Sequence, residues 1–279
     1  MRGLPASGKS TKAKEIVEES GNTIRLNKDL LRTMLHFDKW SGKNEAQTTE
    51  AEESLAVQFL AFGTNVVVDD TNLNPKVLNK WKEMVKELDE KFEVVDLTDV
   101  PLETCIERDS QRPNPVGRDV IINMARKFGL YKFDRREIIC DIDGTLCDIS
   151  NRLHLIKGNE RKDWDAFFAE IPKDEPRLDI IEHVRELSKT HTIVLVTGRP
   201  ARFKPQTLEW LERYNVPYET IIMRNDNDTR EDGIIKKEIL DAYFKKDLVD
   251  LVIDDRPRVI RMWREWGLKV EDVGKGIEF

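Results

Sequence analysis

The chain has 279 residues, of which 39% are hydrophobic and 35% charged, and its formal net charge is −7. This balance is typical of a globular protein and argues against a disordered chain. No apolar run approaches the roughly 20 residues of a membrane span, and the first residues lack the apolar stretch of a signal peptide. The length favours two domains of about 140 residues. The three cysteines, Cys105, Cys140 and Cys147, predict reduced thiols in a cytoplasmic protein, because their number is odd and their spacing does not suit a metal.

Short apolar runs alternate with amphipathic segments along the chain. The first kind predicts buried strands at Thr23–Asn27, Asn65–Asp69, Phe92–Leu97, Glu137–Ile142, Thr192–Thr197 and Leu248–Ile253. The second predicts helices at Thr11–Ser20, Pro75–Glu90, Asp163–Glu170, Glu175–Lys189 and Gly233–Lys245. Such alternation predicts an α/β fold with parallel sheets and helices on both faces. The polar stretch Lys127–Arg136 is the expected boundary, which gives domains of residues 1–134 and 135–279.

A phosphate-binding motif precedes the first helix. The segment Gly3–Ser10 (GLPASGKS) matches G-x-x-x-x-G-K-[ST] at every fixed position. Its backbone N–H groups would surround phosphates, Lys9 would reach the β- and γ-phosphates, and the Ser10 hydroxyl would bind Mg²⁺. The positive end of the next helix would face the same phosphates. We therefore predict an ATP site formed by Gly3, Ser7, Gly8, Lys9, Ser10 and Thr11.

Such a loop normally follows a buried strand, whereas only Met1 and Arg2 precede Gly3 here. Two explanations remain: the natural start lies upstream, or the loop belongs to an abridged and weakened kinase site. We favour the first.

Polar side chains follow the next strands of the first half. Asp29 comes after a strand and could accept a proton from an attacking hydroxyl, although it could also be a helix N-cap. Arg32 lies on the same helical face. Arg108 and Arg112 precede a proline-bearing loop and could clamp phosphates. The stretch from Arg108 to Arg136 contains eight basic residues and three acidic ones. This stretch could bind phosphates, or it could form a solvated helical face.

A second motif, DIDGT, follows the strand predicted at Glu137–Ile142. Strand alternation places Asp141 and Asp143 on the same side at the carboxyl edge of the sheet. One carboxylate can attack phosphorus and the other can protonate the leaving alcohol. Gly144 permits a turn, and Thr145 can orient Asp143.

Further groups of that kind follow on later elements. Thr197 and Arg199 follow a strand and could bind phosphate oxygens, and Lys236 could neutralise phosphoryl charge. Asp254 and Asp255 end another strand and supply the oxygen ligands that Mg²⁺ prefers. We therefore predict a metal site at Asp141, Asp143, Asp254 and Asp255. Ser10 would be the metal ligand of the predicted ATP site.

The four-part order DIDGT, TGR, Lys236 and Asp254-Asp255 resembles the haloacid-dehalogenase-type phosphatase superfamily. The order GLPASGKS, LNKDLLR, VDDTNLNP and ERDSQR resembles the kinase half of phage-type polynucleotide kinase–phosphatases, and the resemblance covers nearly the whole chain, kinase first. It implies a P-loop kinase domain and a haloacid-dehalogenase-like phosphatase domain with a small cap.

The resemblance also implies roles for single residues. Asp29 would be the general base for a 5′-hydroxyl, and Arg112 with Arg108 would form a lid over ATP. Leu30 stands where the family often has an acidic residue, which puts some substrate contacts in doubt. Substrate binding would involve Arg32, Asp70, Thr71, Asn72, Arg224 and Arg230.

We predict from these motifs an enzyme that uses ATP and Mg²⁺ to phosphorylate 5′-hydroxyl ends and to remove 3′-phosphates through an aspartyl-phosphate intermediate. RNA-versus-DNA preference and activity on 2′,3′-cyclic phosphates stay open. The resemblance implies a homo-oligomer, a functional link to a nucleic-acid ligase, no membrane and, for a phage protein, the cytoplasm of the bacterial host. Two alternatives remain: a metabolite kinase fused to a small-molecule phosphatase, and a nucleotide-responsive protein with a degenerate kinase half.

Overall fold

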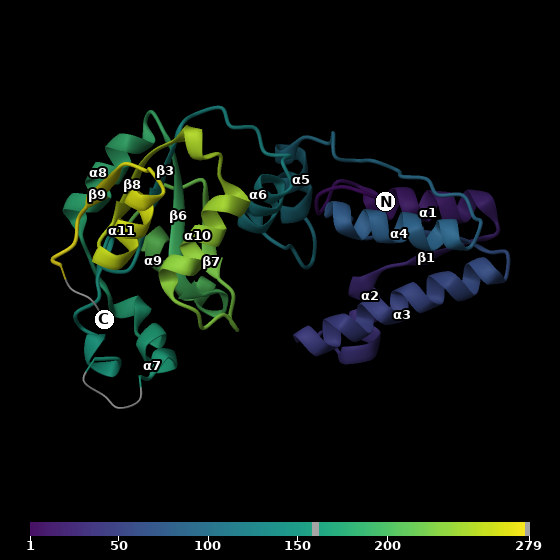
Figure 1. Cartoon of the computed structure of the whole chain (residues 1–279), viewed down its shortest axis with the longest axis horizontal. Coiled ribbons are helices and arrows are strands. Elements are labelled where there is room, and N and C mark those ends of the chain that lie inside the picture. The colour runs from purple at the N-terminus through teal and green to yellow at the C-terminus, as the bar shows by residue number, and fades with distance from the viewer. Residues whose placement is uncertain (158–161, 277–279) are drawn as a thin grey trace. The chain divides into compact units, whose positions relative to one another are not determined.

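The computed structural model describes residues 1–157 and 162–276 and contains two compact units, Met1–Leu130 and Tyr131–Phe279 (Figure 1). Each unit has its own buried core. The α/β architecture predicted from the sequence is confirmed in both units.

The first unit is built on a pair of short parallel strands. β1 (Thr23–Leu26) pairs with β2 (Asn65–Val68), and Leu26 lies opposite Val68. Its core contains Leu26 with Ala56 and Trp81 from the helices. The described helices are α1 (Lys9–Ser20), α2 (Lys28–His36), α3 (Gly42–Ala61), α4 (Pro75–Glu87), α5 (Leu102–Ser110) and α6 (Arg118–Lys127).

The strand predicted at Phe92–Leu97 is wrong. The segment forms only an isolated bridge between Arg2 and Asp96, with hydrogen bonds from the Arg2 N–H to the Val95 carbonyl (2.9 Å) and from the Leu97 N–H to the Arg2 carbonyl (2.8 Å). A β-branched apolar run is not sufficient for a strand, because a strand also needs a partner that continues the ladder. Here pairing is confined to one residue.

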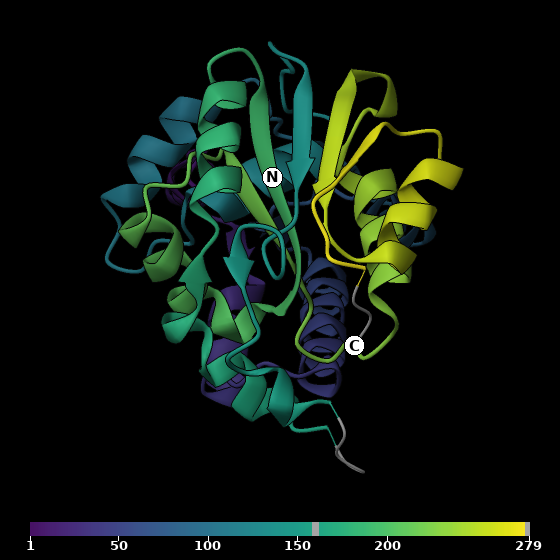
Figure 2. The same ribbon diagram turned by 90° about the vertical axis from the view of Figure 1, so that its left-hand side faces the viewer.

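The second unit contains a five-stranded parallel sheet in the order β7-β6-β3-β8-β9. Helices cover both faces (Figure 2). Trp210 of α9 belongs to one core cluster and Trp263 of α11 to the other. The strands are β3 (Glu137–Cys140), β6 (Thr192–Pro200), β7 (Thr220–Arg224), β8 (Val249–Asp254) and β9 (Val270–Asp272), and the helices are α8 (Leu178–Ser188), α9 (Lys204–Arg213), α10 (Asp232–Tyr243) and α11 (Pro257–Glu265).

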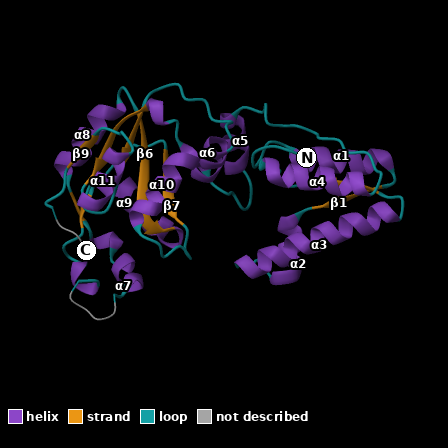
Figure 3. Ribbon diagram, in the orientation of Figure 1, coloured by secondary structure: helices purple, strands orange, loops and turns teal. Residues whose placement is uncertain are grey.

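A small insert separates β3 from α8. It opens with β4 (Cys147–Asp148) and closes with β5 (Glu175–Pro176), which pair antiparallel. Between them lie the six-residue helix α7 (Trp164–Ala169) and two 3-10 turns, Leu153–Leu155 and Ile171–Lys173 (Figure 3). The helix predicted at Asp163–Glu170 is therefore confirmed. The one predicted at Glu175–Lys189 begins only at Leu178, because residues 175 and 176 pair as a strand.

Among the described residues, no helix combines the length and the apolar character that a membrane crossing requires.

Candidate active sites

The carboxyl edge of the five-stranded sheet brings together acidic residues from separate parts of the sequence. Asp141 follows β3 directly, and Asp254 is the last residue of β8. Lys236 on α10 donates to Oδ1 of Asp141 and to Oδ2 of Asp254, both at 2.9 Å. All three side chains are buried. The sequence prediction that these residues meet is therefore confirmed, and the single ammonium group links the two carboxylates.

Asp255 completes a group of three carboxylates. One oxygen from each of Asp141, Asp254 and Asp255 lies within 4.8 Å of the others. Three buried carboxylates around one lysine carry an excess of negative charge, and hard oxygen ligands are what Mg²⁺ prefers. These residues therefore fit a divalent cation.

The backbone after Asp143 makes room for this group. Gly144 has φ +84°, and a Cβ at this position would lie 2.1 Å from Oδ2 of Asp255. Only glycine fits here. The Thr145 hydroxyl donates to Oδ1 of Asp255 at 3.2 Å, so our expectation that Thr145 orients Asp143 is wrong. The reason is the turn at Gly144, which directs the threonine toward the end of β8.

Asp143 lies in a different environment from Asp141. Its Oδ1 accepts hydrogen bonds from the guanidinium groups of Arg199 (2.6 Å) and Arg152 (2.6 Å). Both arginine side chains are fully buried. The Asp143 carboxylate, which we predicted among the metal ligands, thus lies outside the three-carboxylate group and against two positive charges. Arg199 was predicted from the sequence, whereas Arg152 was not.

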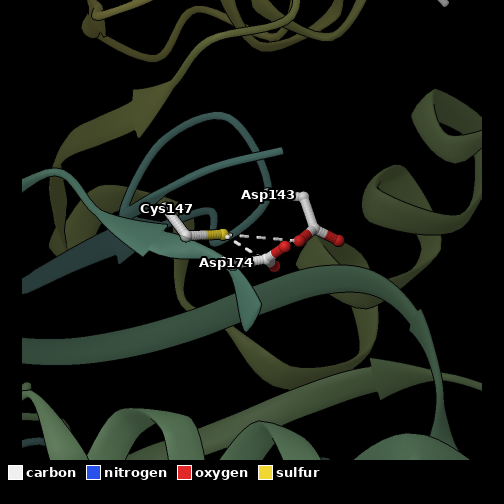
Figure 4. Close-up of side chains that lie close together, drawn as sticks. All are labelled: Asp143, Cys147 and Asp174. Atoms are coloured by element: carbon white, nitrogen blue, oxygen red, sulfur yellow. Dashed lines mark hydrogen bonds between the residues drawn. The ribbon is translucent and has the colours of Figure 1, made fainter. Parts of the chain in front are cut away.

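Asp174 and Cys147 complete this second cluster (Figure 4). Asp174 accepts from Nε of Arg152 at 2.7 Å, and the Cys147 thiol lies 3.6 Å from Oδ1 of Asp143 and 3.5 Å from Oδ2 of Asp174. Two carboxylates and a thiol at such distances could hold a metal. Here, however, two guanidinium groups already balance the two carboxylates, so we interpret the cluster as a buried ion-pair network.

The two aspartates of the DIDGT motif differ in pKa. Burial raises the pKa of Asp141 well above its usual value, although Lys236 opposes the shift. Burial also acts to raise the pKa of Asp143, but Arg152 and Arg199 outweigh it and hold that pKa well below its usual range. Burial, reinforced by Asp254, raises the pKa of Asp255 to about 6. Burial thus raises the pKa of Asp141 and Asp255 at the candidate cation site, whereas two arginines lower the pKa of Asp143, and a bound cation would favour the ionised form of Asp141.

An open pocket of about 410 Å³ contains Asp141 and Asp143 in its lining. Arg224 also lines it, but its guanidinium is engaged, because Nε donates to the Gly198 carbonyl (2.8 Å) and an Nη to the Arg230 carbonyl (2.7 Å). Arg230 pairs with Asp228 at 2.6 Å and with Glu238. Arg224 and Arg230, which we predicted to bind substrate, thus both line the pocket, where they also make hydrogen bonds and ion pairs with neighbouring residues. The Thr197 hydroxyl accepts from the Arg199 N–H at 3.2 Å.

In the first unit, Gly3–Gly8 forms a compact loop before α1, and Lys9 and Ser10 are the first residues of that helix. Gly8 has φ +99° and caps the helix, and Nζ of Lys9 donates to the Leu4 carbonyl at 2.6 Å. Burial lowers the pKa of Lys9. Ser7 is buried, whereas Ser10 and Thr11 are exposed at the start of α1. The free N–H groups of this helix start suit an anion.

Three hydrogen bonds hold the residues that precede and begin the loop, on the side where we expected a strand. The Met1 amino group donates to the Val68 carbonyl at 2.9 Å. The Gly3 N–H donates to the Thr71 carbonyl at 3.0 Å, and Nδ2 of Asn72 donates to the Met1 carbonyl at 2.9 Å. Thr71 and Asn72 therefore support the loop through the end of β2.

Asp29 and Arg32 form an ion pair on α2 with a distance of 2.7 Å, and the Asp29 side chain is 84% exposed. Arg32 also pairs with Glu45 at 2.9 Å. The alternative that Asp29 caps the helix is wrong, because the N-cap is Asn27, whose side chain accepts from the Leu30 N–H.

A buried acidic pair lies beside α2. Asp70 accepts from the Lys28 N–H at 3.1 Å, and Nζ of Lys28 lies 3.4 Å from Asp70 and 3.7 Å from Glu52. Glu52 comes from α3 and is fully buried. Burial, with the charge of Asp70, raises the pKa of Glu52 to about 8.

The two predicted lid arginines have different surroundings. A Cβ on Gly8 would lie 3.9 Å from an Nη of Arg108, which places Arg108 over the loop. Arg112 pairs with Asp109 at 3.1 Å, and its charge contributes to lowering the pKa of Lys9. In the basic stretch Arg108–Arg136, Arg126 is only 4% exposed. Arg126 therefore neither faces solvent nor lies open to a phosphate.

Sequence reasoning missed three acidic residues and one arginine of these clusters: Glu52, Arg152, Asp174 and Asp232. Asp232 precedes Lys236 by one helical turn, and their ion pair of 3.5 Å could have been found from the i,i+4 spacing. Arg152 and Asp174 lie within the insert at positions that no local pattern marks. Only the structure shows that these two residues are buried and belong to the cluster around Asp143.

Two family models match the chain. The model described as the polynucleotide kinase PNKP phosphatase domain matches residues 135–277, and the model described as an AAA domain matches residues 1–130.

A provisionally named bifunctional polynucleotide kinase/RNA ligase of Autographa californica nuclear polyhedrosis virus is 30% identical over 297 residues, which cover 97% of this chain and 41% of that protein. The chain therefore spans about two fifths of the length of this relative. The relative is viral but does not come from a bacteriophage, the source that the sequence resemblance implies.

Among solved structures, a chain of the Pnkp1/Rnl/Hen1 RNA repair complex is 25% identical, with a TM-score of 0.42, and the match covers 99% of this chain and 95% of that one. A haloacid dehalogenase-like family hydrolase from Streptococcus pneumoniae is 16% identical, with a TM-score of 0.38, over 49% of this chain and 83% of that one.

Proposed function

Because the chain belongs to the family of the polynucleotide kinase PNKP phosphatase domain, we propose that it heals broken nucleic-acid ends. The second unit removes 3′-phosphates, and the first transfers the γ-phosphate of ATP to 5′-hydroxyls. The observation that carries the proposal is the pair of unlike aspartates, Asp141 beside Lys236 and Asp143 between two arginines, at one sheet edge.

In the phosphatase reaction, an oxygen of Asp141 bonds to phosphorus while the bond from phosphorus to the 3′-oxygen breaks. Lys236 holds Asp141 in position and balances negative charge on the phosphoryl group. A Mg²⁺ ion held by Asp141, Asp254 and Asp255 would supply further positive charge to the phosphoryl oxygens and to the nucleophile. Asp254 and Asp255 are kept in place by contacts from Lys236 and Thr145.

Asp143 transfers the protons. It gives a proton to the departing 3′-oxygen and later takes one from the water that hydrolyses the aspartyl phosphate. Arg152 and Arg199 keep its carboxylate ionised in the free protein, which suits the second step. An arriving phosphate dianion offsets the charge of these arginines and raises the proton affinity of Asp143, so that Asp143 takes up from solvent the proton that it gives to the 3′-oxygen.

In the kinase reaction, the loop Gly3–Ser10 and the start of α1 bind the ATP phosphates, with Lys9 as the charge partner and Ser10 as a ligand of Mg²⁺. Asp29 accepts the proton of the 5′-hydroxyl, and Arg32 binds the neighbouring phosphate. Arg108 and Arg112 cover the nucleotide. The ion pair between Asp29 and Arg32 supports this assignment, since it places base and phosphate ligand side by side.

Together the two reactions yield 5′-phosphate and 3′-hydroxyl ends, which are the ends that a ligase joins. We therefore propose nucleic acid as the substrate and a ligase as the functional partner. The relative named a polynucleotide kinase/RNA ligase supports this proposal and favours RNA.

The test is a matched assay with ATP and Mg²⁺ on two oligonucleotides of one sequence, one with a 5′-hydroxyl and one with a 3′-phosphate. We expect labelled phosphate on the first and release of inorganic phosphate from the second. Activity on free sugars or small phosphate esters that exceeds activity on both oligonucleotides would contradict the proposal.

A further inference from the structure

An exposed tryptophan lies in the lining of the pocket that contains Asp141 and Asp143. Trp164 opens α7, and 41% of its surface is exposed, although an indole of this size is usually better covered. The other pocket-lining aromatic residues, Phe167 and Phe168, are 2% and 7% exposed. The mouth of the pocket therefore presents one aromatic side chain to solvent.

Buried neighbours hold this indole in place. Its ring is stacked on Phe168 with centroids 6.0 Å apart at 22°, and it meets Phe167 edge-on at 5.6 Å. A side chain supported in this way loses little conformational freedom when a ligand binds, which favours binding. Exposure of the apolar indole to water is unfavourable in the free protein, and a flat ligand that covers the ring would relieve this unfavourable free energy.

The aromatic support is also tied to the phosphatase site. The guanidinium of Arg152 lies 4.1 Å from the centroid of the Phe167 ring while it donates to Asp143 at 2.6 Å. One arginine thus fixes both the carboxylate and the support of Trp164. The position of the indole is therefore set relative to Asp143.

Charge on the same side of the pocket suits a polyanion. Nζ of Lys162 lies 5.5 Å from the centroid of the Trp164 ring, and Lys162 also lines the pocket. This ammonium group lies over the ring, so a base that stacks on the indole displaces the flexible lysine side chain, whose charge can then meet a backbone phosphate. A purely apolar partner would leave this ammonium group without a matching charge.

We propose that Trp164 forms the binding site for the nucleobase of the 3′-terminal nucleotide, with the base stacked on the indole while its phosphate lies at Asp141. This inference rests on the proposed phosphatase function and specifies its substrate as an end that carries a base. Stacking uses the π-face that every base has, so the site accepts all four bases.

The test measures base preference. Initial rates are compared for an oligonucleotide with a 3′-phosphorylated nucleotide and for the same strand ending in a 3′-phosphorylated abasic residue. We expect the wild-type protein to prefer the base-bearing end by about tenfold, equal to about 1.4 kcal/mol, and Trp164→Ala to reduce this ratio to near one. Trp164→Phe should retain most of the preference.

Leu178→Ala serves as the matched control, because Leu178 is 63% exposed in the same unit and does not line the pocket. It should keep the wild-type ratio. Equal losses on both ends in Trp164→Ala would assign a structural role to the indole, and an unchanged ratio would exclude stacking. Either result overturns the inference.

Binding separates this inference from the proposed function. The dissociation constant of the 3′-phosphorylated oligonucleotide is measured by fluorescence anisotropy for the wild-type protein and for Trp164→Ala. A weaker complex in the variant supports the base site even if no phosphate is released, a result that would refute only the phosphatase activity. Equal binding of base-bearing and abasic ends by the wild-type protein overturns the base site alone.

Discussion

The two units hold their candidate catalytic aspartates in opposite ways. In the second unit, Asp141 is buried, the side chain of Asp143 is only 13% exposed, and each has buried cationic partners. In the first, Asp29 is 84% exposed and pairs with a neighbour on its own helix. A buried network keeps its geometry without a ligand, whereas a surface pair competes with water and contributes little to stability. The phosphatase site is therefore organised in the free protein, and the kinase site depends more on its substrates.

The largest effect expected is the separation of the two activities. Asp141→Asn should lower 3′-phosphate release at least about 10³-fold, because the nucleophile is lost, while 5′-phosphorylation continues. Lys9→Ala should do the reverse. Both activities of each variant are measured on the matched oligonucleotides. Loss of both in a folded variant would contradict two separate sites.

The buried network gives the next largest effect. Asp174→Asn leaves the buried Arg152 with half of its negative partners, so the second unit should lose about 3 kcal/mol of stability. The pH profile of 3′-phosphate release should also shift to lower pH, because the freed guanidinium acts more strongly on Asp143. Urea unfolding and initial rates at several pH values measure the two effects.

Glu182→Gln is the matched control for Asp174→Asn. It breaks an exposed pair of the same kind, Glu182 with Arg185 at 2.9 Å, and should cost less than about 1 kcal/mol. A similar loss of unfolding free energy in both variants would show that the buried ion pairs stabilise the protein no more than an exposed pair does.

An effect of comparable size, but spread over a range of pH, concerns Glu52 in the first unit, whose pKa burial raises to about 8. The folded protein retains a proton that the unfolded chain releases above its ordinary pKa near 4.5. Stability therefore falls as the pH rises through this window. Glu52→Gln should remove about 2 to 4 kcal/mol of this pH dependence, measured by native-state hydrogen exchange of the α3 amides. An equally steep pH dependence in the variant would refute the protonated state of Glu52.

The smallest effect concerns Arg32. Arg32→Ala should reduce phosphorylation of a nucleoside 3′-phosphate about tenfold more than that of the nucleoside, because only the first offers a phosphate to the guanidinium. The measurement is kcat/KM for both acceptors. Equal losses would place Arg32 in support of Asp29 instead.

The sequence was sufficient to predict those site residues that are marked by a local motif or by the end of a clear secondary-structure element. Asp141 and Asp254 were found because each lies at the end of a clear strand, and parallel strands end at one edge. Lys236 was chosen over Lys237 only because of the family resemblance. The strand at Phe92–Leu97 was predicted wrongly because its pairing partner is not encoded in its own residues. Arg152 and Asp174 could not be predicted, since they reach Asp143 only through the folding of the insert.

Arg152 has a consequence for the kinetics of turnover. It joins the insert to Asp143 by an ion pair of 2.6 Å, and within the insert it pairs with Asp174 at 2.7 Å and packs on Phe167. To swing the insert away from the sheet, the protein would have to separate charges in its interior, which is costly. The described part of the insert around Arg152 is therefore held against Asp143, and a strand end enters through the existing pocket. We expect the catalytic rate to be governed by the chemical steps or by product release, without a preceding closure step.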